Sequence, residues 1–245
     1  MKKVLITGAN KSIGFETARQ LLQKGFYVYL GSRNIENGRE AVAKLKAEGL
    51  TEVEAIQIDV SNDESVKAAR AEIGKKTAVL DVLINNAGIS GGHPQTATGV
   101  GIDTFKIVFE TNVYGVVRVT QYFIDLLRKS PEPRIVNVSS GQGSLTLASD
   151  PSYRYYNYKG VVYHSSKAAL NMYTVNLAYE LRDTPFKVNA VDPGFTDTDF
   201  NNHRGTGTVA VAGARLVKYA IIDASGPTGK FFSEENNPET GEIPW

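Results

Sequence analysis

The sequence predicts a doubly wound α/β fold, in which helices cover both faces of a mostly parallel sheet. Short apolar segments alternate with longer segments of helical periodicity in the N-terminal part of the chain. The apolar segments carry few polar residues, which is typical of parallel strands that are buried on both faces. Strands that alternate with helices of this length indicate successive strand–helix–strand units. At 245 residues and 42% hydrophobic content, the chain can bury the core of one such domain.

The expected elements follow one another in a regular order. The first strand lies at residues 4–7 and the first helix at 13–24, where Gly25 marks the helix end. Further strands are expected at residues 26–30, 53–58, 79–84, 134–138 and 186–191, and further helices at 34–48, 62–73, within 101–129 and at 163–182. No linker-like or repeated segment divides the sequence, so we expect a single domain over residues 1–245.

Composition excludes several classes of function. The 27 Lys and Arg residues nearly balance the 26 Asp and Glu residues, which argues against nucleic acid or an anionic membrane as a partner. The absence of cysteine excludes disulfides and thiolate metal sites, and the few histidines stand apart from organised acids. No apolar run approaches the ~18 residues of a membrane span, and the N-terminal run is too short for a signal peptide. We therefore expect a cytoplasmic protein that binds small molecules and no metal.

A glycine-bearing loop at residues 7–14 joins the first expected strand to the first helix. Gly8 permits a sharp turn, and Gly14 allows the helix to pack close to the sheet. The free N–H groups at the start of the helix would face phosphate groups. This arrangement predicts a dinucleotide site.

The end of the second strand indicates which nicotinamide cofactor binds. A site for NAD has a carboxylate there to bind the ribose 2′-hydroxyl, whereas this strand is followed by Arg33. Arg33 and Lys11 could converge on a 2′-phosphate, because guanidinium groups suit bidentate phosphate contacts. The sequence therefore predicts NADP(H).

Tyr163 and Lys167 stand four residues apart in a predicted helix, on one face. A neighbouring ammonium favours the phenolate and lowers the pKa of the tyrosine. A phenol of this kind can donate a proton to a carbonyl oxygen. The pair therefore predicts carbonyl or alcohol chemistry beside the dinucleotide site.

These motifs, together with Asn-Asn-Ala-Gly at residues 85–88 and Ser140, resemble those of the short-chain dehydrogenase/reductases. Within that superfamily the chain is most similar to the monomeric carbonyl reductases, in Asn10-Lys11, in residues 47–50 and in the tail at 226–234. The resemblance implies a Rossmann-type single domain with seven strands. Its cofactor half would span about residues 1–130 and its catalytic half about 131–245.

The resemblance also implies roles at matching positions. Asn112 would hold a water of a proton relay, Asp59-Val60 would contact adenine, and Pro193-Gly194 with Thr198 would hold the nicotinamide end. The expected catalytic residues are Asn112, Ser140, Tyr163 and Lys167. The expected cofactor contacts are Gly8, Asn10, Lys11, Ser12, Ile13, Gly14, Arg33, Asp59, Val60, Asn86, Ala87, Gly88, Tyr163, Lys167, Pro193, Gly194, Thr196 and Thr198.

The chain departs from the family pattern at two places. Ser12 replaces the usual glycine, and although a serine can cap a helix, it adopts positive φ poorly. An insertion at about residues 145–162 separates Ser140 from Tyr163 and contains a second pair, Tyr155 and Lys159. We favour Tyr163, because Gly160 would interrupt a helix directly after Lys159.

The leading functional prediction is an NADPH-dependent reductase of ketones, aldehydes or quinones. Alternatives are an NADP-dependent secondary alcohol dehydrogenase of the terpenoid or steroid type, a 3-oxoacyl carrier-protein reductase, and a regulator that senses NADP(H). The tyrosines of the insertion could line a substrate pocket or pack the insertion down. By covering the helix at 163–182, the insertion could also keep the protein monomeric.

Overall fold

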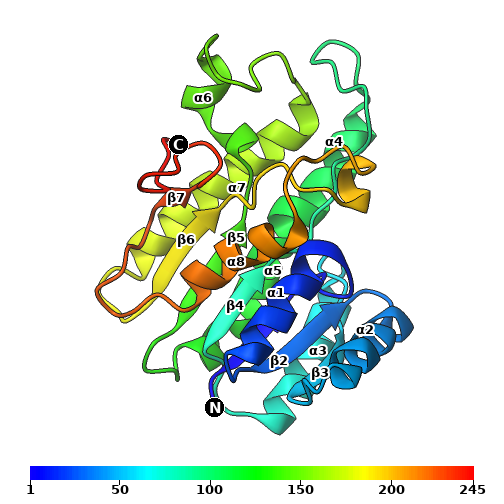
Figure 1. Cartoon of the computed structure of the whole chain (residues 1–245), viewed down its shortest axis with the longest axis vertical. Helices are drawn as coiled ribbons and strands as arrows, with labels where there is room; N and C mark the ends of the chain where they lie inside the picture. Colours follow the sequence, from blue (N-terminus) through cyan, green and yellow to red (C-terminus); the bar gives the residue numbers. More distant parts are fainter.

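The computed structural model describes residues 1–245 and contains one seven-stranded sheet, in the order β3-β2-β1-β4-β5-β6-β7 (Figure 1). All neighbouring strands run parallel. The strands are β1 (Lys3–Ile6), β2 (Tyr27–Ser32), β3 (Val53–Gln57), β4 (Val82–Asn85), β5 (Arg134–Val138), β6 (Lys187–Val191) and β7 (Phe231–Phe232). The doubly wound, Rossmann-type prediction is confirmed. The order of strands reverses between β1 and β4, where such sheets bind ligands outside the carboxyl ends of their strands.

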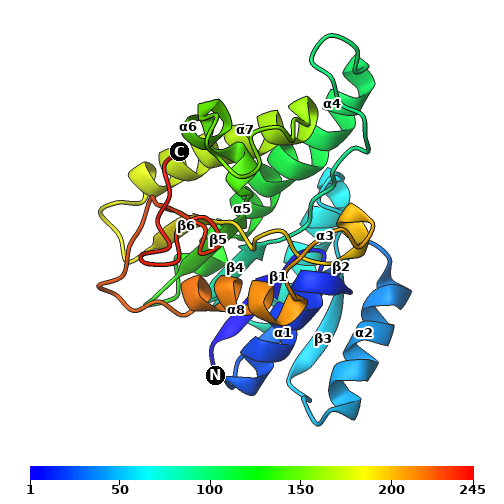
Figure 2. The same cartoon turned by 45° about the horizontal axis from the view of Figure 1, so that its top comes forward.

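Helices connect the strands on both faces of the sheet. They are α1 (Ser12–Gln23), α2 (Ile35–Ala47), α3 (Asp63–Lys76), α4 (Ile102–Phe109), α5 (Gly115–Leu127), α6 (Leu145–Ser149), α7 (Val161–Glu180) and α8 (Val209–Ala220). A π-helical turn, Glu110–Tyr114, joins α4 to α5. Helices α1, α2 and α8 cover one face, whereas α3, α5 and α7 cover the other (Figures 1 and 2).

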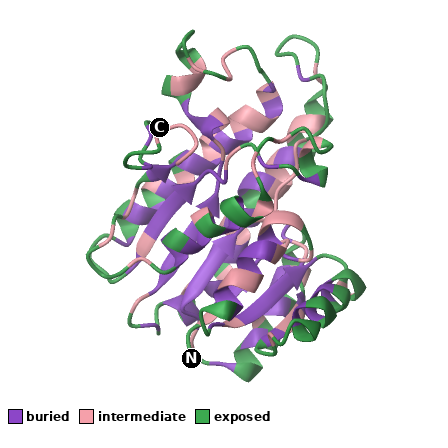
Figure 3. Cartoon of the chain, in the orientation of Figure 1, coloured by how far each residue is buried: buried purple, intermediate pink, exposed green.

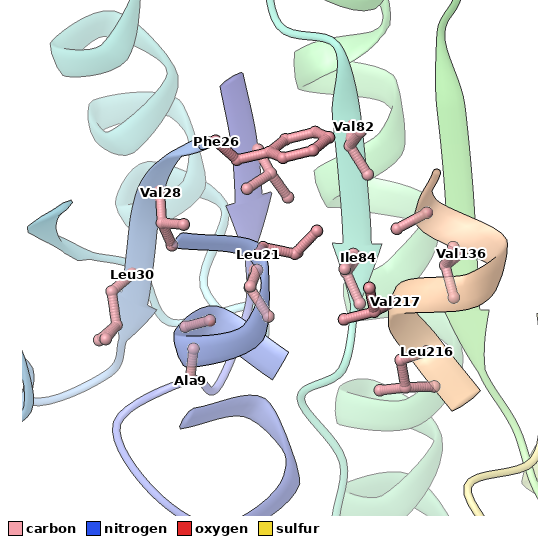
Figure 4. Close-up of a cluster of buried hydrophobic side chains, with 14 of the residues drawn as sticks. Ala9, Leu21, Phe26, Val28, Leu30, Val82, Ile84, Val136, Leu216 and Val217 are labelled. Atoms are coloured by element: carbon pink, nitrogen blue, oxygen red, sulfur yellow. The ribbon is translucent and has the colours of Figure 1, made fainter. Parts of the chain in front are cut away.

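Alternation of side chains along the strands creates two cores. Val4 and Ile6 of β1 belong to the cluster beneath α1, α2 and α8, whereas Leu5 belongs to the cluster beneath α3, α5 and α7. Leu216 and Val217 of α8 pack in the first cluster with residues of β4 and β5 (Figure 4). The strands are consequently buried almost throughout, and exposed residues concentrate on helices and loops (Figure 3). This explains why the strands read as continuous apolar runs.

Most element bounds agree with the sequence-based expectations to within a few residues. The prediction for β5 is confirmed at both ends, whereas β4 begins at Val82, three residues later than expected. Helix α7 begins at Val161, so that the helix includes Tyr163 in its first turn. Helix α8 and strand β7 were not located in advance. Strand β7 has only two residues, too few for a periodic signal.

The insertion folds as α6 and a series of turns, which rise above the sheet near the C-terminus (Figure 1). The Thr146 hydroxyl donates to the carbonyl oxygen of Trp245 over 2.9 Å, and the Trp245 ring stacks on Phe231. In the C-terminal half of α7, Met172 and Tyr179 are 63% and 67% exposed. The insertion therefore packs against the tail and does not cover that part of α7, contrary to the expectation. None of the helices combines the length and the apolar character that crossing a membrane requires.

Candidate active site

A cleft of about 1610 Å³ lies over the carboxyl ends of the strands and receives residues from both halves of the chain. Of the predicted site residues, those that line it are Gly8, Asn10, Lys11, Ser12, Ile13, Arg33, Asp59, Val60, Asn86, Ala87, Gly88, Ser140, Tyr163, Lys167, Pro193, Gly194, Thr196 and Thr198. Gly14 and Asn112 are buried and do not line the cleft. The structure thus gathers nearly the whole predicted set around one cavity.

The loop between β1 and α1 approaches the end of β4 closely. Gly8 has φ +62°, and a Cβ there would lie 3.0 Å from Ala87 Cα. A Cβ on Gly14 would lie 2.5 Å from Asn86 Nδ2. The Asn86 amide in turn donates to the carbonyl oxygens of Thr7 and Gly8, over 2.8 and 3.0 Å. The loop is therefore held against the end of β4 with no room for a side chain at Gly8 or Gly14, which is consistent with close approach to a pyrophosphate.

Ser12 adopts the conformation that glycine would adopt. Its φ is +51°, and it is the first residue of α1. The N-cap is Lys11, which makes no side-chain capping bond. Ser12 therefore does not cap the helix, and the loop keeps its shape at a cost in backbone strain.

Two cations border the expected adenosine end of the cleft. Lys11 Nζ forms an ion pair with Asp199 Oδ2 over 2.8 Å. Asp199 lies in the segment that follows β6, and both residues line the cleft. Arg33, directly after β2, is exposed and makes no ion pair. The Asp59 carboxylate, which also lines the cleft, accepts hydrogen bonds from the backbone N–H and the hydroxyl of Ser61. The protein therefore offers an unpaired guanidinium, and no carboxylate at the end of β2, to a ribose of the cofactor.

Tyr163 and Lys167 both face the cleft from α7. Lys167 Nζ lies 5.7 Å from the centre of the Tyr163 ring and donates to the carbonyl oxygen of Val138 over 2.8 Å. Burial raises the pKa of Tyr163, and the negative charge of Asp192 raises it further. Burial lowers the pKa of Lys167 to about 8, against a smaller opposing effect of Asp192. In the protein alone the pKa of the phenol is therefore raised and not lowered, contrary to the expectation, because desolvation has the largest effect.

The two adjacent serines have different surroundings. Ser139 is buried, and its hydroxyl donates to Asn171 Oδ1 over 2.6 Å. Ser140 borders the cleft, where its hydroxyl accepts from the backbone N–H of Gln142 over 3.3 Å, and its proximity lowers the pKa of the Tyr163 phenol. Ser139 also lines the cleft, but its hydroxyl is engaged by Asn171, so Ser140 is the better candidate to bind a ligand beside Tyr163.

The second tyrosine–lysine pair does not come together. Tyr155 and Lys159 precede α7 in the turns of the insertion. The Tyr155 hydroxyl donates to Glu235 Oε1 over 3.2 Å, whereas Lys159 Nζ donates to the Ala148 carbonyl oxygen over 2.7 Å. Their functional groups are therefore engaged by different partners.

Asn112 lies in the π-helical turn and is fully buried. Its side-chain oxygen accepts from Ile89 N, and its amide donates to the Ile89 carbonyl oxygen and to Ser166 Oγ, all within 3.0 Å. The Asn112 side chain thus fixes the segment after β4, and it makes no hydrogen bond with Lys167.

Sequence reasoning overlooked Asp192, at the carboxyl end of β6. It is buried, accepts from Ser233 Oγ over 2.7 Å and from Gly194 N over 2.9 Å, and lines the cleft. Burial raises its pKa. An acidic residue directly before Pro193-Gly194 was the available signal.

Aromatic side chains surround Tyr163 at the remaining end of the cleft. Phe200 meets the Tyr163 ring edge-on at 5.6 Å, and Tyr155 meets Phe195 at 6.1 Å. The Tyr158 hydroxyl lies 2.6 Å from His93 Nε2. Several tyrosines of the insertion therefore line the cleft and at the same time pack the insertion against neighbouring loops.

The chain is similar to known proteins over most of its length. The family model described as short chain dehydrogenase matches residues 2–208. The chain is 38% identical to the short-chain dehydrogenase anuI of Penicillium roqueforti, over 95% of this chain and 94% of that protein. It is 34% identical to (−)-isopiperitenone reductase of Mentha piperita, over 94% and 96% of the two chains.

Among solved structures, the NADPH-bound carbonyl reductase from chicken fatty liver superimposes with a TM-score of 0.84 at 25% identity, covering 100% of this chain and 99% of that one. The likeness thus extends over the whole fold. The chain belongs to the short-chain dehydrogenase/reductase family, whose members are nicotinamide-dependent oxidoreductases of C=O and CH–OH groups on small molecules.

Proposed function

We propose that this protein is an NADPH-dependent carbonyl reductase that acts on a ketone, an aldehyde or a quinone. The observation that carries the proposal is that Tyr163 and Ser140 line the same cleft as the loop at residues 7–14, with Lys167 Nζ 5.7 Å from the centre of the Tyr163 ring. Two hydroxyls that line one part of a cleft can both hydrogen-bond to the carbonyl oxygen of a bound substrate.

In this proposal Tyr163 donates its proton to the carbonyl oxygen of the substrate, and Ser140 donates a hydrogen bond to the same oxygen. When bound, NADPH supplies the hydride that adds to the carbonyl carbon. Lys167 holds the ribose next to the nicotinamide and interacts with the phenol. Because its surroundings raise the pKa of Tyr163, the phenol holds its proton at neutral pH, as a reductase requires.

We assign the proton relay behind Tyr163 to the turn that contains Asn112. A Cβ at Gly88 would lie 3.4 Å from Asn112 Oδ1 and 3.7 Å from Lys167 Nζ, so both groups border the same position. Because the Asn112 side chain is engaged by Ile89 and Ser166, it would act by holding this turn in place. A water near Lys167 would then return the proton to the phenol.

The preference for NADPH over NADH rests on Arg33 and Lys11. Arg33 makes no ion pair, and Lys11, whose present partner is Asp199, lines the same cleft. A 2′-phosphate would be attracted by both cations. The similar chicken protein, which binds NADPH, supports this choice.

For the substrate we propose a neutral molecule with a flat apolar surface. Tyr158, Phe195 and Phe200 remain 43%, 37% and 44% exposed although they line the cleft. A ligand that covers these rings would remove apolar surface from water. Similarity to (+)-neomenthol dehydrogenase of Capsicum annuum, at 34% identity over 93% of this chain, favours as a second candidate a secondary alcohol dehydrogenase of the terpenoid type.

A panel of carbonyl compounds tests the proposal directly. NADPH oxidation would be followed with aromatic ketones, cyclic terpenoid ketones, quinones and a carrier-protein 3-oxoacyl thioester, and NADP⁺ reduction with the matching alcohols. We expect turnover of at least one of the ketones or quinones and much slower oxidation of alcohols at neutral pH. Turnover confined to the alcohols or to the acyl thioester would replace the proposal with the corresponding alternative.

A further inference from the structure

Gln95 is a buried polar residue that lies outside the proposed chemistry. It sits in the loop between β4 and α4 and is 3% exposed. Its side-chain amide uses both of its donors and accepts two further hydrogen bonds. When all the hydrogen-bonding groups of a buried amide are paired, the amide holds the segments that it contacts in a defined geometry.

One end of the Gln95 amide caps the catalytic helix. Helix α7 follows Gly160, which has no side chain with which to cap it. Gln95 Oε1 accepts from Val162 N and Tyr163 N, each over 3.1 Å. The Gln95 carbonyl oxygen accepts from Val161 N over 3.3 Å. Three of the N–H groups that a helix start leaves unpaired are thus satisfied by one remote residue.

The other end of the amide holds the loop that borders the cleft. Gln95 Nε2 donates to the carbonyl oxygens of Ser90 and Gly92, over 2.6 and 2.7 Å. Ser90 and Gly92 line the same cleft as Tyr163. Gln95 therefore sets the distance between this loop and the start of α7.

The backbone of Tyr163 is consequently held on both sides. Its N–H donates to Gln95, and its carbonyl oxygen accepts from Ser166 Oγ over 2.7 Å. Ser166 in turn accepts from Asn112 Nδ2 over 3.0 Å. The position of the phenol depends on this backbone, because few rotatable bonds separate the backbone from the tyrosine ring.

We propose that Gln95 is a positioning residue, which places the Tyr163 phenol and the substrate-side loop at a fixed separation. The inference rests on the proposed carbonyl reduction, since it assigns Gln95 a role in that reaction. The acceptor end of Gln95 would govern proton donation, and hence kcat. The donor end would govern the shape of the loop at residues 89–93, and hence the KM for the carbonyl compound.

Two substitutions distinguish the contribution of the acceptor end of the Gln95 amide from that of its donor end. Gln95→Met retains the length of the side chain and removes both kinds of hydrogen bond. Gln95→Glu retains an acceptor for Val162 N and Tyr163 N, and it removes the donors to Ser90 and Gly92. Gln121→Met is the matched control, because Gln121 is exposed on α5 and makes no side-chain hydrogen bond.

We expect Gln95→Met to lower kcat about tenfold or more, and Gln95→Glu to raise the carbonyl KM several-fold with a kcat near that of the parent. The KM for NADPH should remain within about twofold in both variants, which a general loss of structure would not allow. Equal kcat and carbonyl KM values in the two variants and the parent would overturn the proposal. An increase in the KM for NADPH as large as the increase in the KM for the carbonyl compound would overturn the proposal as well.

Hydrogen exchange provides a readout that does not require activity. Gln95→Met should increase amide exchange both in residues 89–95 and at the start of α7, whereas Gln95→Glu should increase it only in the loop. Unchanged exchange in both segments would contradict the connection itself. If the parent protein reduces no carbonyl compound, the proposed function fails, and exchange alone still decides whether Gln95 connects the two segments.

Discussion

At the scale of single residues, the buried charges around α7 determine how the site responds to pH. Lys167 and Asp192 are both buried near Tyr163, and the negative charge of Asp192 raises the pKa of Tyr163 and of Lys167. Desolvation favours the neutral form of every one of these groups. Desolvation lowers the pKa of Lys167, so Lys167 loses its positive charge as the pH rises.

We therefore expect kcat/KM for NADPH to be constant at neutral pH and to fall above about pH 8, as Lys167 loses its proton. Asp192 raises the pKa of Lys167, so Asp192→Asn should move this decline to lower pH. Steady-state rates measured across the alkaline range in both proteins check the shift. A decline at the same pH in both proteins would exclude Asp192 as a contributor.

Arg33 is the residue on which the choice of cofactor should depend. Arg33→Ala should raise the KM for NADPH about tenfold, which corresponds to about 1.4 kcal/mol, because one charge-assisted contact with the 2′-phosphate is lost. The KM for NADH should change by less than about twofold, since NADH lacks that phosphate. Arg39→Ala, at an exposed arginine of α2 outside the cleft, is the control. NADH turnover equal to that with NADPH in the parent protein would refute the assignment.

Sequence reasoning at the residue scale succeeded where a motif has a fixed spacing and failed where a contact is made through space. The helical spacing of Tyr163 and Lys167 placed both residues in the cleft. The partner of Lys11, by contrast, is Asp199, which follows a different strand. Desolvation of the phenol likewise depends on segments that no local pattern reveals, and it reversed the expected direction of the Tyr163 pKa.

At the scale of elements, the start of α1 shows a local conflict between sequence and structure. Ser12 stands at φ +51°, where an L-residue is strained by roughly 1–2 kcal/mol. The turn nevertheless forms, because Asn86 bonds to the loop and Gly14 allows α1 to pack closely. The sequence revealed the unusual residue and the structure revealed how it is accommodated.

Ser12→Gly should consequently leave the free energy of unfolding unchanged or raise it by up to about 1 kcal/mol. Ala43→Gly, at an exposed position inside α2, should lower it by about 1 kcal/mol, because glycine ordinarily weakens a helix. Urea unfolding of the two variants and the parent gives the comparison. Equal destabilisation by both substitutions would mean that Ser12 is not strained.

The elements themselves were predictable in proportion to the strength of their periodicity. The buried strands of the centre, such as β5, were located from their apolar composition. The end of the sheet was not, because β7 is held by its neighbours and by the packing of Trp245 on Phe231. Such stabilisation is tertiary and leaves no local signal.

At the scale of the whole molecule, the fold brings a phosphate loop from the first strand and a tyrosine–lysine pair from a late helix to one cleft. The strand order, with β1 and β4 adjacent at the centre, makes this possible. The sequence predicted this arrangement, because alternation of strands and helices specifies the topology strongly. The course of the insertion was not predictable, since it depends on contacts with the C-terminal residues.

The resemblance to the monomeric carbonyl reductases still predicts a monomer, although the insertion leaves the C-terminal half of α7 uncovered. Light scattering should give a mass near 26.6 kDa at the concentrations used for assays. Because Met172 and Tyr179 are exposed on α7, the structure leaves this helix open to a partner. A mass corresponding to a dimer or a tetramer would contradict the proposal, and Met172→Glu would then show whether α7 forms the interface.

The central claim is that the Tyr163 phenol provides the proton in carbonyl reduction, and a comparison of two single substitutions tests it most directly. Tyr163→Phe removes that hydroxyl, and Tyr155→Phe removes a hydroxyl of the same cleft that is engaged by Glu235. With the best substrate of the panel, we expect Tyr163→Phe to lower kcat by about 100-fold or more with NADPH still bound, and Tyr155→Phe to retain most of the activity. The reverse outcome, in which Tyr163→Phe remains active and Tyr155→Phe does not, would contradict the account.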